Sequence, residues 1–152
     1  MKKSMKYILL SVLLGMGSVS VGAYADAGFT VPPVDKSDKL IITDTKVGTG
    51  AEAADGKRVS VHYTGWLYDA KAKDHKGKKI DSSRDHNNMP YSFVLGKKQV
   101  IDGWDQGLVG MKVGGLRTLV IPGHLGYGSH GAGEMVPPNA KLVFDVELLD
   151  IM

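Results

Sequence analysis

Apolar and polar residues alternate along several stretches of the chain. In the clearest stretch, 58–67, Val59, Val61 and Tyr63 share one side. Polar residues, among them His62, occupy the positions between them. A period of two residues is typical of a β-strand with one buried face, so Tyr63 is expected on the buried side. Further strands are predicted over 40–46, 91–95, 116–121 and 141–151.

One stretch follows a longer period. Within 99–111, the large apolar residues Ile101, Trp104, Leu108 and Met111 recur at intervals of three or four. Such spacing places them on one face of a short helix. This face needs an apolar surface to cover it, and the sheet supplies one. The predicted fold class is therefore α+β, a mostly antiparallel β-sheet with one short α-helix.

Two glycines fall inside this helix, and each costs roughly 1 kcal/mol relative to alanine. Gly103 and Gly107 therefore indicate a close approach of backbone or ligand, or a helix held by tertiary packing. The indole of Trp104 belongs to the first turn, where backbone N–H groups lack intrahelical partners. We predict that it forms the floor of a pocket that also offers a hydrogen-bond donor. The alternative is a tryptophan that serves the core alone.

The first 25 residues have the three parts of a secretory signal peptide. Three lysines lie within the first six residues, an apolar run follows, and Ala23-Tyr24-Ala25 forms a small-residue cleavage site. Serines and glycines interrupt the apolar run, which disfavours an uncleaved membrane anchor. Cleavage is predicted near Ala25, followed by export to the periplasm or the medium. Residues 26–39, with two adjacent prolines, are predicted to be a flexible linker to one domain at 40–152.

Net charge and cysteine content disfavour several classes of function. The formal charge is +3, but three of the nineteen basic residues belong to the signal, which leaves sixteen against sixteen acidic residues. A near-neutral mature chain disfavours a nucleic-acid partner. No cysteine is present for a lipid anchor, a disulfide or a thiol nucleophile. The lysine-rich stretch 68–79 is predicted to be a solvated loop, with an acidic partner or lipid headgroups as alternatives.

Several apparent motifs lack the sequence context that their chemistry requires. Residues 126–131 match the dinucleotide pattern GxGxxG, but a strand follows where a helix N-terminus is needed. The five histidines lack metal-site spacing, so no metal is expected. Ser82 and Ser83 lack the context of a serine nucleophile. An apolar site with few polar groups remains, and the glycine-rich loop 122–139 is predicted to be a flap that presents Tyr127.

Six short motifs occur together and in the order seen in one known family. They are 61–65 (VHYTG), 81–85 (DSSRD), 100–104 (VIDGW), 127–128 (YG), 137–138 (PP) and 142–148 (LVFDVEL). With these motifs the chain resembles the FKBP-type peptidyl-prolyl cis-trans isomerases, the macrolide-binding immunophilins, from about residue 40 to residue 151. The resemblance implies a twisted antiparallel sheet of about five strands wrapped around one short helix.

The resemblance also implies the site. It implies catalytic positions at Tyr63, Asp81, Ile101, Trp104, Tyr127 and Phe144, and substrate-binding positions at Ile80, Tyr91, Phe93, Val100, Met135 and Val136. The Ile101 N–H and the Tyr127 hydroxyl would donate to substrate carbonyls, and Asp81 would lie near the twisting bond. Ile80, Gln99, Ala132 and Met135 depart from the common pattern of the family, which bears on turnover and sequence preference.

The implied function is the acceleration of X-Pro bond rotation during the folding of exported proteins, by desolvation and hydrogen bonding and without cofactor or metal. Expected partners are proline-containing polypeptides and the macrolide inhibitors tacrolimus and rapamycin. Segments 26–39 and 122–139 are too short for the dimerisation arm or chaperone insert of some members, so a monomer is expected.

The alternative is a binding module or holdase that uses the same pocket without turnover. Ile80 favours this alternative, because its aliphatic side chain is smaller than the phenylalanine of the best-studied members. A third hypothesis is a lipid-surface protein acting through the lysine-rich stretch.

Overall fold

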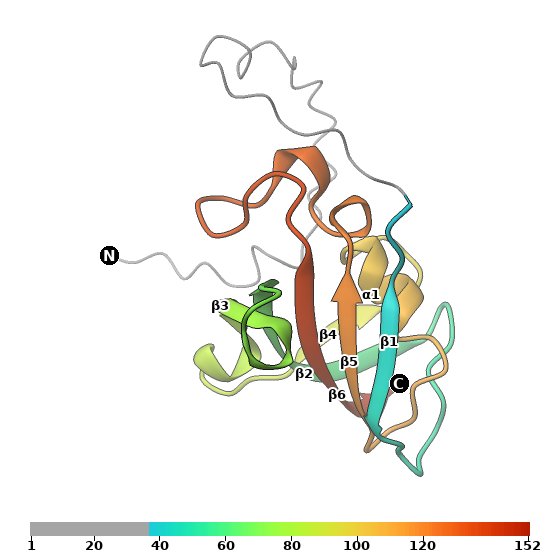
Figure 1. The fold of residues 1–152 in the computed structure, drawn as a ribbon. Coiled ribbons are helices and arrows are strands. Elements are labelled where there is room, and N and C mark those ends of the chain that lie inside the picture. Colours follow the sequence, from blue (N-terminus) through green and yellow to red (C-terminus); the bar gives the residue numbers. More distant parts are fainter. Residues whose placement is uncertain (1–36) are drawn as a thin grey trace, which may run out of the picture.

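The protein folds as one antiparallel sheet with a short helix against one face (Figure 1). The computed structural model describes residues 37–152, so the predicted signal peptide and most of the predicted linker lie outside the described residues. The strands are β1 (Ile41–Lys46), β2 (Arg58–Tyr68), β3 (Lys76–Ser82), β4 (Tyr91–Val94), β5 (Leu116–Ile121) and β6 (Leu142–Ile151), and the helix is α1 (Asp102–Gly107). Their order across the sheet is β1-β5-β6-β2-β3, with β4 also paired to β2.

The α+β class is confirmed, and the sheet has six strands where about five were expected. The additional strand is β3, which occupies the end of the stretch that we predicted to be a solvated loop. That prediction was wrong for residues 76–79. Their lysines fit an edge strand because charged side chains there stay in water and protect the unpaired edge. Lys76 pairs with Asp145 at 2.6 Å and Lys79 with Asp85 at 2.8 Å.

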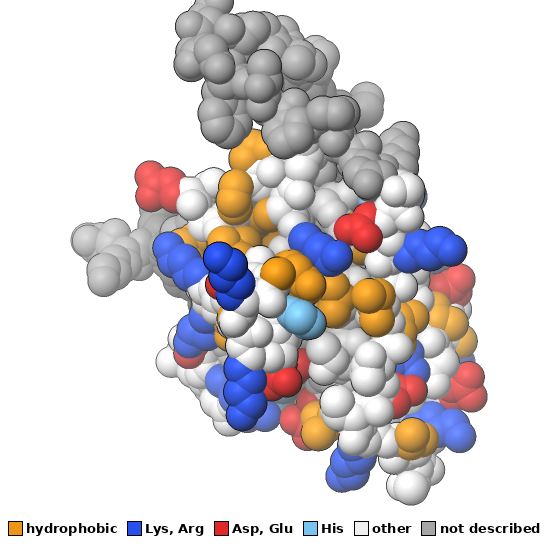
Figure 2. Space-filling view, viewed as in Figure 1, with side chains coloured by type: hydrophobic (Ala, Val, Ile, Leu, Met, Phe, Trp, Pro, Cys, Tyr) orange, Lys and Arg blue, Asp and Glu red, His pale blue; other side chains and the backbone are white. Residues whose placement is uncertain are grey.

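Basic and acidic side chains are interspersed on the face drawn in Figure 2, around a band of apolar side chains. The described residues of this face thus form no single basic surface. None of the helices within residues 37–152 has the length and apolar character needed to cross a bilayer.

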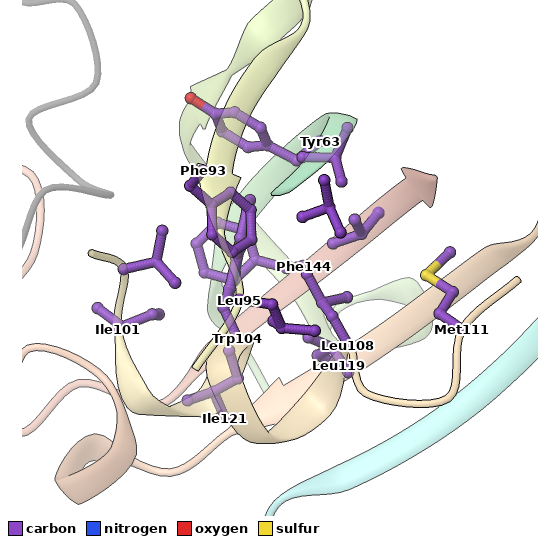
Figure 3. Close-up of a cluster of buried hydrophobic side chains, with 14 of the residues drawn as sticks. Tyr63, Phe93, Leu95, Ile101, Trp104, Leu108, Met111, Leu119, Ile121 and Phe144 are labelled. Carbon is purple, nitrogen blue, oxygen red and sulfur yellow. The ribbon is translucent and has the colours of Figure 1, made fainter. Parts of the chain in front are cut away.

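The core lies between the concave face of the sheet and α1 (Figure 3). The alternation of β2 is confirmed, because Val59, Val61 and Tyr63 are almost completely buried. The neighbouring strands β5 and β6 contribute Leu119 and Phe144, which face each other in the register of the sheet. Burial of this apolar face is the main force that fixes the register of the strands.

Helix α1 is shorter than the predicted stretch. Its bounds are Asp102–Gly107, with Ile101 as the residue before the helix and Leu108 as the residue after it. The predicted apolar face is nevertheless buried in full, because the chain turns at Gly110, where φ is +84°, and brings Met111 back to the core. The apolar spacing therefore identified the buried residues correctly and overestimated the length of the helix.

The C-terminal end of α1 is held by a charge from the sheet. Arg117 of β5 is nearly buried and donates to the carbonyls of Gly107 and Val109 at 2.9 and 3.0 Å. The same guanidinium donates to both carboxylate oxygens of Asp44 on β1. Because the last turn of α1 has no basic residue of its own, Arg117 supplies the cation that stabilises this helix end.

The two helix glycines are explained by close packing on β5. A Cβ atom at Gly103 would lie 2.5 Å from Ile121 Cγ2, and one at Gly107 would lie 2.8 Å from Leu119 Cδ2. Of the alternatives raised by the sequence, the approach of helix to strand is thus the one that the structure shows. The close approach sets the depth at which Trp104 enters the core.

Candidate functional site

The site is built around the indole of Trp104, which is completely buried. Three rings surround it from different strands: Tyr63 of β2 at 5.2 Å between centroids, Phe93 of β4 at 5.7 Å and Phe144 of β6 at 5.4 Å (Figure 3). Tyr63 and Phe144 meet the indole edge to face, a favoured geometry for aromatic pairs. Tyr91 continues the group and stacks on Phe93 at 5.7 Å. Three strands, β2, β4 and β6, thus bring four aromatic rings together around the tryptophan of α1.

Donors without partners lie beside this cluster. The Tyr127 hydroxyl and the Trp104 Nε1–H are buried, and neither finds a hydrogen-bond partner within residues 37–152. The backbone N–H of Ile101 likewise donates no hydrogen bond within residues 37–152. The Ile101 carbonyl, by contrast, accepts from the N–H groups of Trp104 and Asp105 in the first turn of α1. Leaving buried donors unsatisfied costs free energy, so such groups indicate a place where a ligand supplies the acceptor.

The Tyr127 hydroxyl stays protonated over the whole physiological range. Burial raises its pKa far above the ordinary value of 10.0, and the negative charge of Asp81 and the neighbouring Tyr91 act in the same direction. Tyr127 is therefore a constant donor, and the Asp81 carboxylate is close enough for its charge to be felt there.

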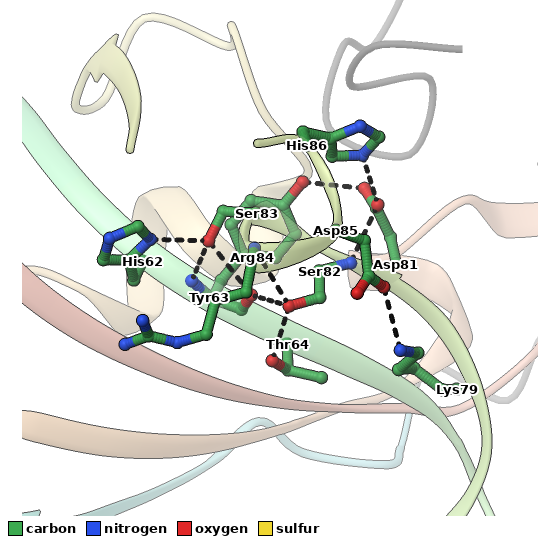
Figure 4. A network of polar contacts seen from close by, with 10 residues as sticks. All are labelled: His62, Tyr63, Thr64, Lys79, Asp81, Ser82, Ser83, Arg84, Asp85 and His86. Atoms are coloured by element: carbon green, nitrogen blue, oxygen red, sulfur yellow. Dashed lines mark hydrogen bonds and ion pairs between the residues drawn. The ribbon is translucent and has the colours of Figure 1, made fainter. Parts of the chain in front are cut away.

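Asp81 is held by three donors (Figure 4). Its Oδ2 accepts from the Tyr63 hydroxyl at 2.7 Å, and its Oδ1 accepts from the Ser82 N–H at 2.8 Å. The third contact joins Oδ1 to Nε2 of His86 at 2.9 Å. Only 10% of the Asp81 side chain is exposed, so the carboxylate is fixed in orientation at the edge of the aromatic cluster.

The structure brings the residues of the predicted site together. Eight of them belong to one buried cluster, namely Tyr63, Ile80, Phe93, Val100, Ile101, Trp104, Val136 and Phe144. Tyr91, Tyr127 and Met135 are partly buried and pack against that cluster. The loop 122–139 contains two 3-10 turns and a β-bridge between Ala132 and Val136. This bridge places Val136 in the core next to the segment that carries Tyr127.

Sequence reasoning missed His86. The five histidines were considered only as metal ligands, and within residues 37–152 no three His, Asp or Glu side chains converge in that way. The contact to Asp81 depends on the 3-10 turn at Ser83–Asp85, which lies between the two residues. The pattern of Asp and His five residues apart, across a Ser-Ser turn, was the available signal.

A depression of about 160 Å³ lies elsewhere, on the opposite face of the sheet. Its wall includes His62, Arg84 and Glu147, and it is a mixed polar surface. Burial, and after it the charge of Arg84, lower the pKa of His62, whereas Glu147 acts in the opposite direction. The orphaned donors and the aromatic cluster favour the Trp104 site over this depression.

The site defines a class: an α+β protein whose buried aromatic cluster has unpartnered hydrogen-bond donors and one oriented carboxylate beside it. Comparison with known proteins gives the family within this class. The family model for FKBP-type peptidyl-prolyl cis-trans isomerase matches residues 50–149. The chain therefore belongs to the FKBP-type peptidyl-prolyl cis-trans isomerase family, whose activity is the isomerisation of peptidyl-prolyl bonds.

Individual relatives agree with this assignment. The chain is 52% identical to an FK506-binding protein of Neisseria meningitidis serogroup B over 112 residues, which cover 74% of this chain and 95% of the relative. It is 48% identical to FK506-binding protein 2 of Kluyveromyces lactis, covering 77% of this chain and 80% of the relative. The crystal structure of AtFKBP13 superimposes with a TM-score of 0.64 at 37% identity, covering 74% of this chain and 93% of that one.

Proposed function

We propose that the pocket over Trp104 catalyses X-Pro bond rotation by favouring the twisted amide over the planar one. The uncatalysed barrier is about 18–20 kcal/mol because resonance gives the amide C–N bond partial double-bond character. Twisting removes this resonance and its charge separation, so the transition state is less polar than the ground state. A dry aromatic pocket therefore binds the transition state better than water does.

The observation that carries this proposal is the pair of orphaned donors at the pocket, the Tyr127 hydroxyl and the Ile101 N–H. They donate to substrate carbonyls and hold the peptide in a turn, which lowers the entropic cost of reaching the twisted geometry. Asp81 lies beside the twisting bond, oriented by Tyr63 and Ser82. No proton transfer, cofactor or metal takes part in this mechanism.

The substrate-binding wall consists of the remaining apolar residues around the aromatic cluster. We assign the proline ring to the surface formed by Ile80, Tyr91, Phe93, Val100, Met135 and Val136, all of which belong to the cluster or pack on it. The macrolides tacrolimus and rapamycin occupy the same surface. This assignment is supported by the relatives, which are named for their binding of FK506.

The cellular role is the folding of exported proteins, in which proline isomerisation is a slow step. The predicted signal sequence, with its expected cleavage near Ala25, supports this role. The mature protein acts as a periplasmic or secreted monomer without a stable membrane anchor. Mass spectrometry of protein purified from the cell envelope or the medium tests the export step, and a mature N-terminus at Asp26 is the expected result.

Refolding of a protein with a proline-limited slow phase tests the function. The wild-type protein is expected to accelerate this phase, and Trp104→Leu is expected to remove the acceleration together with isomerisation of a short peptide. Trp66→Leu is the matched control, because the Trp66 ring contacts Lys76 and lies outside the core cluster. If Trp104→Leu abolished peptide isomerisation while refolding assistance persisted, the chain would be a binding module or holdase.

A further inference from the structure

Exposed apolar side chains gather at one edge of the sheet. Of the seven large apolar side chains that are exposed within residues 37–152, five lie on β1 or beside it: Ile41, Ile42, Val47, Val109 and Leu116. The two isoleucines are 53% and 45% exposed and point to opposite faces, because successive side chains of a strand alternate. Leu116 is paired with Lys46 across β1 and β5. The Val109 carbonyl accepts from Arg117, which also pairs with β1. Exposed apolar residues that cluster in this way indicate a binding surface.

The strand at the centre of this patch is an open edge of the sheet (Figure 1). Within residues 37–152, β1 pairs with β5 alone, and the register between them is regular from Ile41 to Asp44. In this part of the chain the backbone of 41–44 makes no hydrogen bond other than those to β5. On an edge strand, alternate residues direct their N–H and C=O groups away from the neighbouring strand. The β1 edge therefore offers unpaired donors and acceptors beside apolar side chains.

The other two edges of the sheet are protected. Strand β3 carries three lysines, and its register with β2 shifts twice. Strand β4 has only four residues, and its Val94 N–H donates to Gln99 Oε1 at 2.9 Å. Lysines, bulges and short length keep an edge from pairing with other chains. Residues 41–44 have none of these features, and their one charged side chain, Asp44, is paired with Arg117 at 2.7 Å.

We propose that the β1 edge is a second binding site, at which an extended apolar segment of a client polypeptide adds to the sheet as a further strand. This inference deepens the function proposed above and rests on it. Unpaired backbone groups along an edge are complementary to an extended backbone, and main-chain hydrogen bonds accept many sequences. The apolar side chains of the patch favour a segment rich in aliphatic and aromatic residues, which an unfolded chain exposes. The site thus recognises a different part of the client from the X-Pro bond.

The place of β1 in the sheet connects this edge to the pocket. Ile41 is paired with Val120, and two residues later the chain leaves β5 and enters the loop that carries Tyr127. A segment added to β1 therefore continues past Ile41 toward the side of the molecule that carries this loop. Ten extended residues span about 33–36 Å, close to the diameter of about 35 Å expected for a domain of this size. A client held at β1 can thus present a proline about ten residues away to the pocket, at a raised effective concentration.

Exchange NMR on two matched peptides tests the proposal with the protein as the cell produces it. The first peptide joins one leucine-proline site, through ten glycine and serine residues, to a seven-residue segment of valine, isoleucine and threonine. The second has glycine and serine in place of that segment. The KM is expected to be about threefold to tenfold lower for the first peptide, with kcat unchanged, because binding at the edge raises the local concentration of the proline. N-methylation of alternate amides in the segment removes backbone donors, keeps the side chains, and is expected to abolish the difference.

Substitutions on the edge locate the binding site. Ile42→Lys and, as a second variant, Ile41→Lys place a charge on the edge and are expected to raise the KM of the first peptide to that of the second. Both are expected to leave isomerisation of the second peptide unchanged, which also shows that they fold. Met152→Lys is the matched control, because this side chain is 65% exposed and lies outside the patch, and it is expected to keep the wild-type difference. The amide resonances of β1 and β5 are expected to shift when the first peptide is added.

The contrary results are equally specific. Equal KM values for the two peptides with the wild-type protein would overturn the proposal, as would a difference that survives N-methylation or both lysine substitutions. Sedimentation velocity is expected to show a monomer, and a dimer that Ile42→Lys dissociates would assign the edge to a second copy of the chain and overturn the proposal. If neither peptide were isomerised, the proposed function would fail, whereas resonance shifts confined to β1 and β5 would still establish the edge as a binding site.

Discussion

Replacing Tyr127 by phenylalanine separates the function of its hydroxyl from its structural role. The substitution removes one oxygen atom and leaves the ring in place. In the free protein this hydroxyl is buried and has no hydrogen-bond partner within residues 37–152. Its removal therefore breaks no intramolecular bond, whereas in the proposed complex it removes a donor to the substrate.

Tyr127→Phe is expected to lower activity without lowering stability. Burying an unpaired hydroxyl costs about 1–3 kcal/mol, so Tyr127→Phe is expected to leave the free energy of unfolding unchanged or to raise it by up to about 1 kcal/mol. The lost bond to the substrate is worth about 0.5–1.5 kcal/mol, which corresponds to a decrease in kcat/KM of roughly 2- to 10-fold.

Tyr63→Phe is the matched control, since it removes the same atom from a hydroxyl that does have a partner. Tyr63 donates to the nearly buried Asp81 carboxylate at 2.7 Å, so its loss is expected to lower the free energy of unfolding by about 1.5–3 kcal/mol. Urea denaturation measures stability, and peptide isomerisation measures kcat/KM. A destabilisation by Tyr127→Phe of more than about 1 kcal/mol, or an unchanged kcat/KM, would refute the reasoning.

Three further predictions concern the scaffold. Arg117→Met is expected to lower the free energy of unfolding by about 2–4 kcal/mol in urea, because two carbonyls at the end of α1 and a carboxylate of β1 lose their donor; a loss below about 1 kcal/mol would contradict the capping role. Gly103→Ala is expected to cost about 1–3 kcal/mol in thermal unfolding despite the better helix propensity of alanine, since the new Cβ would lie 2.5 Å from Ile121; a gain in stability would show that α1 can move away from β5. Burial, and then Arg84, lower the pKa of His62 below 6.5, so the unfolded chain binds more protons in that range and stability falls as the pH drops from about 6.5. His62→Asn is expected to weaken this pH dependence, and an unchanged slope would refute the assignment.

The strands could be predicted because their burial follows from local alternation. Alternate residues enter the core from Val59 to Tyr63 in β2 and from Leu142 to Leu148 in β6, so the pattern of the sequence specifies the face as well as the strand. Val143 of β6 is buried in addition. The apolar face of α1 was equally visible. The length of α1 could not be predicted from the apolar spacing. The helix ends at Gly107, whose carbonyl accepts from Arg117 of β5, and the chain then turns at Gly110. Contacts of this kind depend on tertiary structure.

Two features of the structure could not be predicted from the sequence pattern. The lysines at the start of β3 indicate a loop by composition, and only pairing with β2 makes them an edge strand. The contact of His86 with Asp81 requires the geometry of the intervening turn, which the spacing alone does not provide. The twelve predicted site positions converge in the structure, whereas their catalytic and binding roles remain predictions.

The central claim is that the pocket over Trp104 lowers the barrier to X-Pro rotation. The most direct test is the rate of cis-to-trans relaxation of a short X-Pro peptide, measured with the purified protein in the absence and presence of rapamycin. Acceleration that rapamycin abolishes is the expected result, since peptide and macrolide compete for one pocket. A folded protein that binds rapamycin and leaves the relaxation at its uncatalysed rate would contradict the claim.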